Sequence, residues 1–212
     1  VERDLRLAEL TGVHYHVSNV STKETVEVIK RAKLNGIKIT CDTSPPYFSL
    51  NELELSTYDT SFKLSPPLRN EEDRIAIQNA IFDDTIDIIT SDHKPMSNDT
   101  KILPFTSAST GASGIETLLP LTLNLLNKSD VSIMNILKKI TLNPSKLLKV
   151  EIPKIKSNEK ANFIIFDPNE QYLINKDLLQ TSPTPFHGRP VQGKNYMSMM
   201  NGEIVFDNLD LL

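Results

Sequence analysis

The sequence predicts an α/β protein with parallel strands, and three observations support this prediction. Strand-like and helix-like segments alternate through the first part of the chain, in the order expected when crossover connections join parallel strands. An apolar run at 86–90 leads directly into Asp92, as when a barrel strand delivers a carboxylate to the mouth of an active site. The pattern then changes to strands separated by a Pro/Gly-rich segment at 182–193. We therefore expect two domains, residues 1–149 and a small β module at 150–212.

Apolar periodicity and capping residues predict the helices. Residues 22–34 carry apolar side chains at helical spacing, after Ser21 or Thr22 as the N-cap. Asn70 is expected to cap the segment 71–82 in the same way. The expected helices are 2–10, 22–34, 71–82 and two or three helices within 114–148.

Short apolar runs rich in β-branched residues predict the strands. Pro45 and Pro46 are expected to force a loop between the second strand and the third. The expected strands are 13–20, 37–41, 62–64 and 86–90 in the first domain, and 161–166 and 196–206 in the second.

Composition and charge argue against several classes of protein. Hydrophobic residues make up 39% of the chain and charged residues 24%, which is ordinary for a globular protein. A net charge of −4 gives no electrostatic reason to expect nucleic acid as a partner. There is no run of about 18 apolar residues to span a membrane and no charged-then-apolar leader for export. The one cysteine, Cys41, allows no intrachain disulfide and indicates the cytoplasm, with the thiol acting as a small buried hydrophobe.

The first domain is too short for a complete barrel, which predicts that the chain associates with a partner. The chain begins at Val1, inside an expected helix and without an initiating Met, which suggests a fragment or a processed product. A complete (β/α)8 barrel takes about 250 residues, and the first domain has room for four strands. Such a half barrel would leave open sheet edges and an unfilled interior. We therefore expect a missing N-terminal half, a second copy of the chain or another partner to cover that opening.

Seven short motifs occur in an order that resembles the C-terminal half of a dihydroorotase of the amidohydrolase superfamily. The resemblance extends over nearly the whole chain. The segments that carry it are 17–23, Pro45, 65–74 (SPPLRNEEDR), 91–95 (SDHKP), 114–117 (GIET), 143–145 (NPS) and 184–188 (TPFHG).

This resemblance implies a TIM-type (β/α)8 metallo-hydrolase barrel with a small β-sandwich built from both ends of the chain. Residues 1–149 would then supply strands five to eight of the barrel, and residues 150–212 the C-terminal part of the sandwich. The family reaction is the reversible cyclisation of N-carbamoyl-aspartate to dihydroorotate in pyrimidine biosynthesis, and zinc is the family's cofactor.

The resemblance also shows substitutions at the metal-ligand positions. The histidine expected on strand five is replaced by Asn19, and the histidine expected after strand six is replaced by Pro46. Zinc binds imidazole, thiolate or carboxylate donors, so neither replacement is a good ligand. The strand-eight aspartate is retained as Asp92, the expected catalytic base and metal ligand. We therefore expect this chain to bind no zinc in the usual way.

Three further residues are candidates for binding substrate. Ser65 stands where the family usually has a substrate-contacting asparagine, and Met96 replaces a substrate-binding histidine. Arg69 either clamps an anion or caps the carboxylates of the following helix. His93 is either a substrate contact or a structural hydrogen-bonding group. Asp92 itself has a structural alternative, a salt bridge to Arg69.

His14 and His16 form a His-x-His pattern that would attract attention as a metal site. Alternate residues of a strand share one face. Because position 19 must face the barrel interior, His14 and His16 have the opposite parity and are expected to face the helix layer, in a structural role.

Two functions of different class remain open. One is a dihydroorotase-family enzyme, or a related hydantoinase or dihydropyrimidinase, with this chain inactive alone. The other is a non-catalytic dihydroorotase-like companion of aspartate transcarbamoylase. Asn19, Pro46, Ser65 and Met96 favour the second, whereas family membership favours the first.

Overall fold

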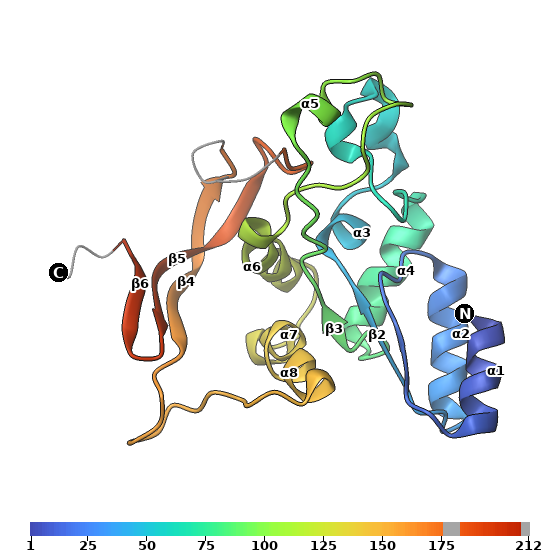
Figure 1. Ribbon diagram of the computed structural model, residues 1–212, viewed down its shortest axis with the longest axis horizontal. Helices are drawn as coiled ribbons and strands as arrows, with labels where there is room; N and C mark the ends of the chain where they lie inside the picture. The colour runs from blue at the N-terminus through green and yellow to red at the C-terminus, as the bar shows by residue number, and fades with distance from the viewer. Residues whose placement is uncertain (176–182, 209–212) are drawn as a thin grey trace.

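The computed structural model describes residues 1–175 and 183–208 (Figure 1). Two three-stranded sheets stand apart, with helix α6 between them (Figure 1). The elements are α1 (Glu2–Thr11), β1 (Tyr15–Val17), α2 (Lys23–Leu34), β2 (Ile39–Thr43), α3 (Pro45–Ser49), η1 (Glu52–Thr57), η2 (Thr60–Phe62), α4 (Glu71–Phe82), β3 (Ile88–Ile89), α5 (Asn98–Lys101), α6 (Ile115–Leu123), η3 (Asn124–Lys128), α7 (Ile133–Ile140), α8 (Leu142–Leu148), β4 (Phe163–Leu173), β5 (Pro190–Met200) and β6 (Glu203–Asp207).

The first sheet is parallel, in the order β1-β2-β3, which confirms the predicted α/β class. The expected helices at 22–34 and 71–82 are also confirmed. Thr22 accepts a hydrogen bond from the backbone N–H of Thr25, and Asn70 accepts one from that of Asp73. These caps satisfy donors that the first turn of a helix leaves free.

Two predictions in the loop region are wrong. Pro45 and Pro46 do not force a loop, because they occupy the first turn of α3, where the missing proline N–H costs no helical hydrogen bond. The segment 62–64 is not a strand. Asp59 accepts a hydrogen bond from the N–H of Ser61 and starts a 3-10 turn there, and the ammonium of Lys63 donates to three backbone carbonyls of the 105–108 loop.

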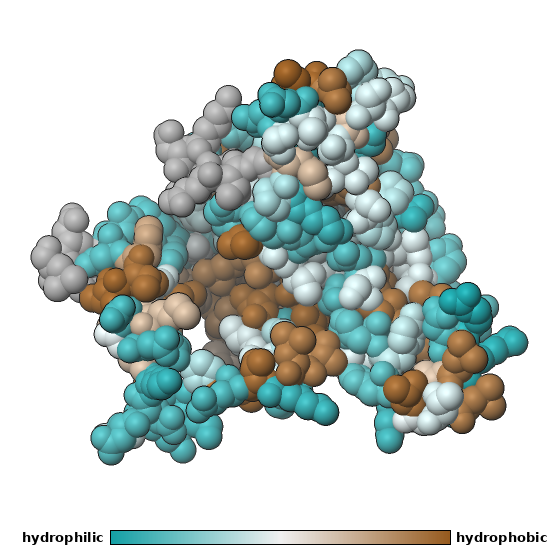
Figure 2. All heavy atoms as spheres, viewed as in Figure 1, coloured by the Kyte–Doolittle hydropathy of each residue, from teal (hydrophilic) through white to brown (hydrophobic). Residues whose placement is uncertain are grey.

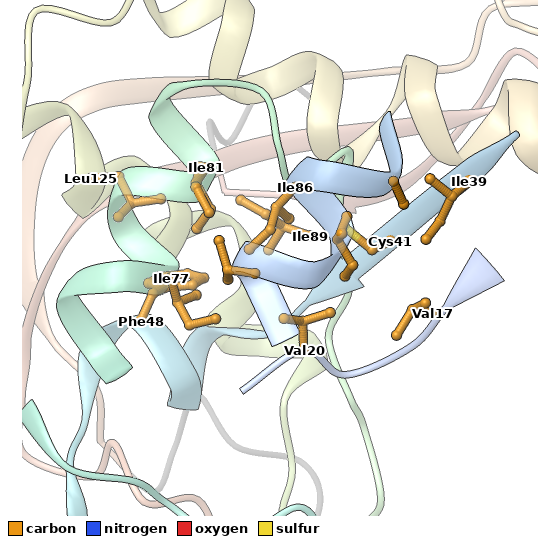
Figure 3. Packing of buried hydrophobic residues seen from close by; sticks show 14 of the residues in the cluster. Val17, Val20, Ile39, Cys41, Phe48, Ile77, Ile81, Ile86, Ile89 and Leu125 are labelled. Atoms are coloured by element: carbon orange, nitrogen blue, oxygen red, sulfur yellow. The ribbon is translucent and has the colours of Figure 1, made fainter. Parts of the chain in front are cut away.

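A hydrophobic core fills the space between the parallel sheet and the helices (Figure 3). The strand residues Val17, Ile39 and Cys41 lie at one end of this core in Figure 3, and Ile77 and Ile81 of α4 lie toward the other end. Burying such side chains stabilises the fold by about 1.5–3 kcal/mol each. One face of β1 and β2 is therefore committed to the helices.

The second sheet is an antiparallel meander, β4-β5-β6. The expected strand at 196–206 is interrupted, because Asn201 and Gly202 both have positive φ and form a two-residue hairpin turn between β5 and β6. β5 begins at Pro190, inside the segment that was expected to separate strands; residues 176–182 of the linker lie outside the described residues. Gly193 lets β5 approach α6 closely, since a Cβ there would lie 2.2 Å from Leu123 Cδ1. Within the described residues, none of the helices has both the length and the apolar character needed to cross a bilayer.

The Cys41 thiol is expected to make stability fall at alkaline pH. Burial, with a smaller contribution from the Asp87 carboxylate, raises the pKa of Cys41 from its ordinary 9.0 to about 12. The folded thiol stays protonated between these values while the unfolded thiol ionises, so the folded state binds more protons. The free energy of unfolding should drop by about 1.4 kcal/mol per pH unit above pH ~9 from this group alone. Urea unfolding at several pH values measures this change in the free energy of unfolding, with Cys41→Ala as the comparison. If the free energy of unfolding fell equally steeply with pH in both proteins, the expectation would be contradicted.

Candidate functional site

Asp92 and Asn19 meet at the ends of β3 and β1. Each residue adopts a left-handed backbone conformation, with φ of 44° at Asp92 and 55° at Asn19. Such conformations are uncommon for residues other than glycine and often mark functional sites. The Asn19 amide Nδ2 donates to Asp92 Oδ1 at 3.2 Å, and the Lys94 ammonium lies 3.0 Å from the same oxygen. The Asp92 carboxylate is only 11% exposed, so these two donors compensate a mostly buried charge.

A polar network connects this pair to the strands behind it. The buried Asp42 carboxylate accepts a hydrogen bond from the backbone N–H of Asn19 at 2.8 Å. Its second oxygen lies 2.9 Å from Nε2 of His16, and Nδ1 of His16 lies 2.8 Å from the hydroxyl of Thr40. Asp42 thus holds the Asn19 backbone in place and orients the His16 ring.

The expected orientation of His14 and His16 is wrong. Both rings contact the Thr40 hydroxyl, on the face of the sheet opposite to the core side chains of Val17 and Cys41. They therefore point away from the helix layer. The alternation of faces does not extend from His16 to Asn19, because β1 ends at Val17 and Asn19 has a left-handed backbone conformation.

Pro46 and Tyr47 of α3 lie near Asp92. Pro46 is buried and lines, with Asp92 and Gly114, a cavity of about 10 Å³, which holds no more than about one water molecule. The Tyr47 hydroxyl donates to the backbone carbonyl of Pro66 at 2.9 Å. Burial, followed by the negative charge of Asp92, raises the pKa of Tyr47 above its usual range, and the charge of Arg69 opposes this shift.

Ser65 and Arg69 lie on the exposed rim of this region. The backbone carbonyl of Arg69 accepts a hydrogen bond from the N–H of Glu52 at 2.7 Å. The structural alternatives for its side chain are not realised within the described residues: Glu71 pairs with Arg74 instead, and Asp92 pairs with Lys94. The Arg69 residue is exposed to solvent.

His93 holds the start of α6 against the end of β3. Its Nδ1 accepts hydrogen bonds from the backbone N–H groups of Gly114 at 3.2 Å and Ile115 at 3.3 Å. It therefore satisfies two donors that the first turn of the helix would leave free. This contact matches the structural alternative for His93.

Sequence reasoning missed three residues of this site. Lys94 stands two positions after Asp92 and could have been noticed as its cation. Asp42 lies on the same face of β2 as Thr40. This is the face that His16 occupies, and His16 was expected on the opposite face. Tyr47 carried no signal beyond its position next to Pro46.

The fold and the position of this site are typical of α/β enzymes. In such enzymes helices cover a parallel sheet, and the polar side chains of the active site gather at the carboxyl ends of the strands.

Comparison with known proteins identifies the family. The chain belongs to the amidohydrolase family, whose model matches residues 1–205. It is 36% identical over 209 residues to a dihydroorotase of Anaplasma phagocytophilum and 38% identical over 208 residues to one of Acetivibrio thermocellus. Each alignment covers 97% of this chain, but only 47% and 49% of the relative, so the chain spans about half the length of these relatives. The solved L-hydantoinase (dihydropyrimidinase) of Arthrobacter aurescens superposes with a TM-score of 0.89 at 26% identity, over 100% of this chain and 49% of that one.

The residues at the expected metal positions do not fit a zinc ion. The Pro46 ring has no donor atom, and Asn19 directs its amide N–H, rather than its oxygen, at Asp92. Asp92 is the one good ligand of the three, and its Oδ1 is already engaged by Lys94. Within residues 1–175 and 183–208, no three His, Cys, Asp or Glu side chains gather as a metal site would require.

Proposed function

We propose that this chain is part of a dihydroorotase-type cyclic amidohydrolase and that, with Asn19 and Pro46 at the ligand positions, it neither binds zinc in the usual way nor turns over substrate. The relatives named dihydroorotase support the reaction class, the opening or closing of a cyclic amide between N-carbamoyl-aspartate and dihydroorotate in pyrimidine biosynthesis. In this proposal the protein works in the cytoplasm, as the single buried cysteine suggests.

The observation that carries the proposal is the state of the Asp92 carboxylate. In a competent cyclic amidohydrolase this group takes a proton from the attacking water and passes it to the leaving amide nitrogen. Here two donors, Asn19 Nδ2 and Lys94 Nζ, share its Oδ1, and the adjoining cavity has no room for a substrate ring. We assign Asp92 as the retained catalytic base and former metal ligand.

The proposed contacts for an anionic substrate are Ser65 and Arg69, both exposed to solvent. His93 positions α6 and the Asp92 turn, rather than contacting substrate directly.

Metal analysis and kinetics of the full-length protein test the proposal. The full-length protein should contain less than stoichiometric zinc and show no dihydroorotate hydrolysis, whereas the double variant Asn19→His, Pro46→His should gain zinc. The variant Asn195→His, remote from Asp92, controls for zinc bound by an added imidazole alone. Stoichiometric zinc with turnover in the unmodified protein would overturn the proposal.

A hydantoinase or dihydropyrimidinase activity is the second candidate, favoured by the structural likeness to the Arthrobacter aurescens enzyme. Hydantoin and dihydrouracil therefore belong in the same assay. Hydrolysis of either, with none of dihydroorotate, would select this candidate.

Exposed apolar surface supports a partner for the chain. Figure 2 shows hydrophobic atoms over the lower ends of α1 and α2, where Leu10 is 82% and Leu34 81% exposed. Patches of this kind mark interaction sites. We propose that an N-terminal barrel half covers this surface, with a second copy or aspartate transcarbamoylase as the alternatives.

Because these apolar side chains are exposed, we expect the 212-residue chain to associate with other copies of itself. Expressed alone, it should form dimers or larger species in light scattering, and adding the N-terminal half of the relatives' barrel should convert these to a defined complex. A monodisperse monomer with a high melting temperature would refute the expectation. Copurification with aspartate transcarbamoylase, without turnover, would select the structural alternative.

A further inference from the structure

A second, larger cavity lies on the other side of α3 from Asp92. Its volume is about 230 Å³, and it is formed by α3, α4, the junction of α6 with η3, and the segment before β5. Pro46 of α3 faces the small Asp92 cavity, whereas Phe48 and Leu50 line the larger one. Phe186 is a lining residue of both cavities.

The inner wall of this cavity is apolar. It includes the buried side chains of Phe48, Leu50, Leu121, Leu125 and Phe186. Two amide side chains also line it, and one polar atom of each is already bonded: Gln78 Nε2 donates to the Phe48 carbonyl at 2.6 Å, and Asn124 Oδ1 accepts from the N–H of Gln192. A ligand would therefore meet a hydrophobic surface in the interior.

The rim of the cavity is positively charged. Among the described lining residues, the ionisable ones are Lys128 and Arg189, both cations. Arg189 pairs with Glu54 at 2.7 Å, while Lys128 has no ion pair within the described part of the chain. Burial, and then repulsion by Arg74, lowers the pKa of Lys128, with Glu71 offsetting part of this. Lys128 is exposed to solvent at the rim, so its ammonium is accessible to an anion that enters the cavity.

We propose that this cavity binds a small organic carboxylate with a compact apolar body. The apolar body contacts Phe186 and Leu121, and the carboxylate pairs with the Lys128 ammonium. The volume lies below the ~300–1,000 Å³ of sites for drug-sized ligands, which favours an acid with a single ring. A bare phosphate would leave the apolar wall unused, so the combination of wall and rim selects a carboxylate with a hydrophobic part.

Benzoate and its neutral isostere benzamide test the proposal on the full-length protein. Titrations followed by calorimetry and by ligand-observed NMR should show saturable benzoate binding and at least about tenfold weaker benzamide binding, as expected for loss of one charge-assisted contact. Lys128→Gln should weaken benzoate about tenfold and leave benzamide unchanged. The matched control Lys146→Gln, an exposed lysine on α8, should change neither.

The variant Asp92→Asn shows which of the two cavities benzoate occupies. If benzoate occupies the larger cavity, this substitution leaves its affinity unchanged. Tighter benzoate binding in Asp92→Asn would place the ligand beside Asp92 and overturn the assignment. Equal binding of benzoate and benzamide, an unchanged affinity in Lys128→Gln, or no saturable benzoate binding would each overturn it as well. None of these outcomes depends on zinc or turnover, so the proposed function can fail independently.

Discussion

Replacing Gly114 with alanine is expected to lower the free energy of unfolding by about 3 kcal/mol. A Cβ at this position would lie 2.2 Å from the backbone carbonyl oxygen of Ser91 and 3.2 Å from its carbon. Backbone atoms cannot rotate away as a flexible side chain would. The φ of Gly114 is −140°, which alanine adopts readily, so the loss would report steric contact rather than backbone strain.

The Gly114→Ala substitution should also affect the candidate site, because the contact between Gly114 and Ser91 joins the start of α6 to the turn that carries Asp92. Moving the two apart would also break the hydrogen bonds that His93 accepts from the first turn of α6. Urea unfolding followed by circular dichroism measures the loss. Ile115→Ala, at an exposed position in the same turn, should change stability by less than about 0.5 kcal/mol. A loss below about 1 kcal/mol in Gly114→Ala would show that the turn adapts and would contradict the expectation.

Replacing Asp42 with alanine is the second change with a large expected effect, a loss of about 3 kcal/mol. The Asp42 carboxylate is nearly buried and receives hydrogen bonds from the Asn19 backbone and from the His16 ring. Its removal leaves both partners unsatisfied, each at about 1–3 kcal/mol. His16 is 23% exposed, so water replaces part of what its ring loses.

Asp42→Asn is the matched variant for this prediction. It keeps an oxygen that can accept from the Asn19 N–H, so it should lose less than half as much stability as Asp42→Ala. Unfolding in urea compares the two. Equal losses would mean that the negative charge, rather than the pair of hydrogen bonds, is what the network requires.

Local signals in the sequence predicted the helices well. Thr22 and Asn70 each stand before an apolar pattern of helical period, and capping depends on atoms within three residues of the cap. The strands were predicted less well. The segment 62–64 has a strand-like composition, but it is held by Lys63 bonds to carbonyls more than forty positions along the chain. Such long-range contacts leave no periodic mark on the sequence.

The candidate site likewise has features that the sequence predicted and features that depend on contacts between distant residues. The apolar run before Asp92 predicted a carboxylate at a strand end, and the motif order predicted the amidohydrolase family that the comparisons support. The contact between Asn19 and Asp92 joins residues 73 positions apart and depends on left-handed turns at both. The same turn at Asn19 reversed the expected facing of His16.

From the residues alone came the α/β class and the capped helices, because each follows from neighbours along the chain, and the order of short motifs gave the amidohydrolase family. Folding in three dimensions decided which donors satisfy Asp92, which face His16 occupies, and that α3 has the small Asp92 cavity on one side and a larger, cation-rimmed one on the other. Those features depend on where separate segments meet, and packing between distant residues, rather than local preference, determines that geometry.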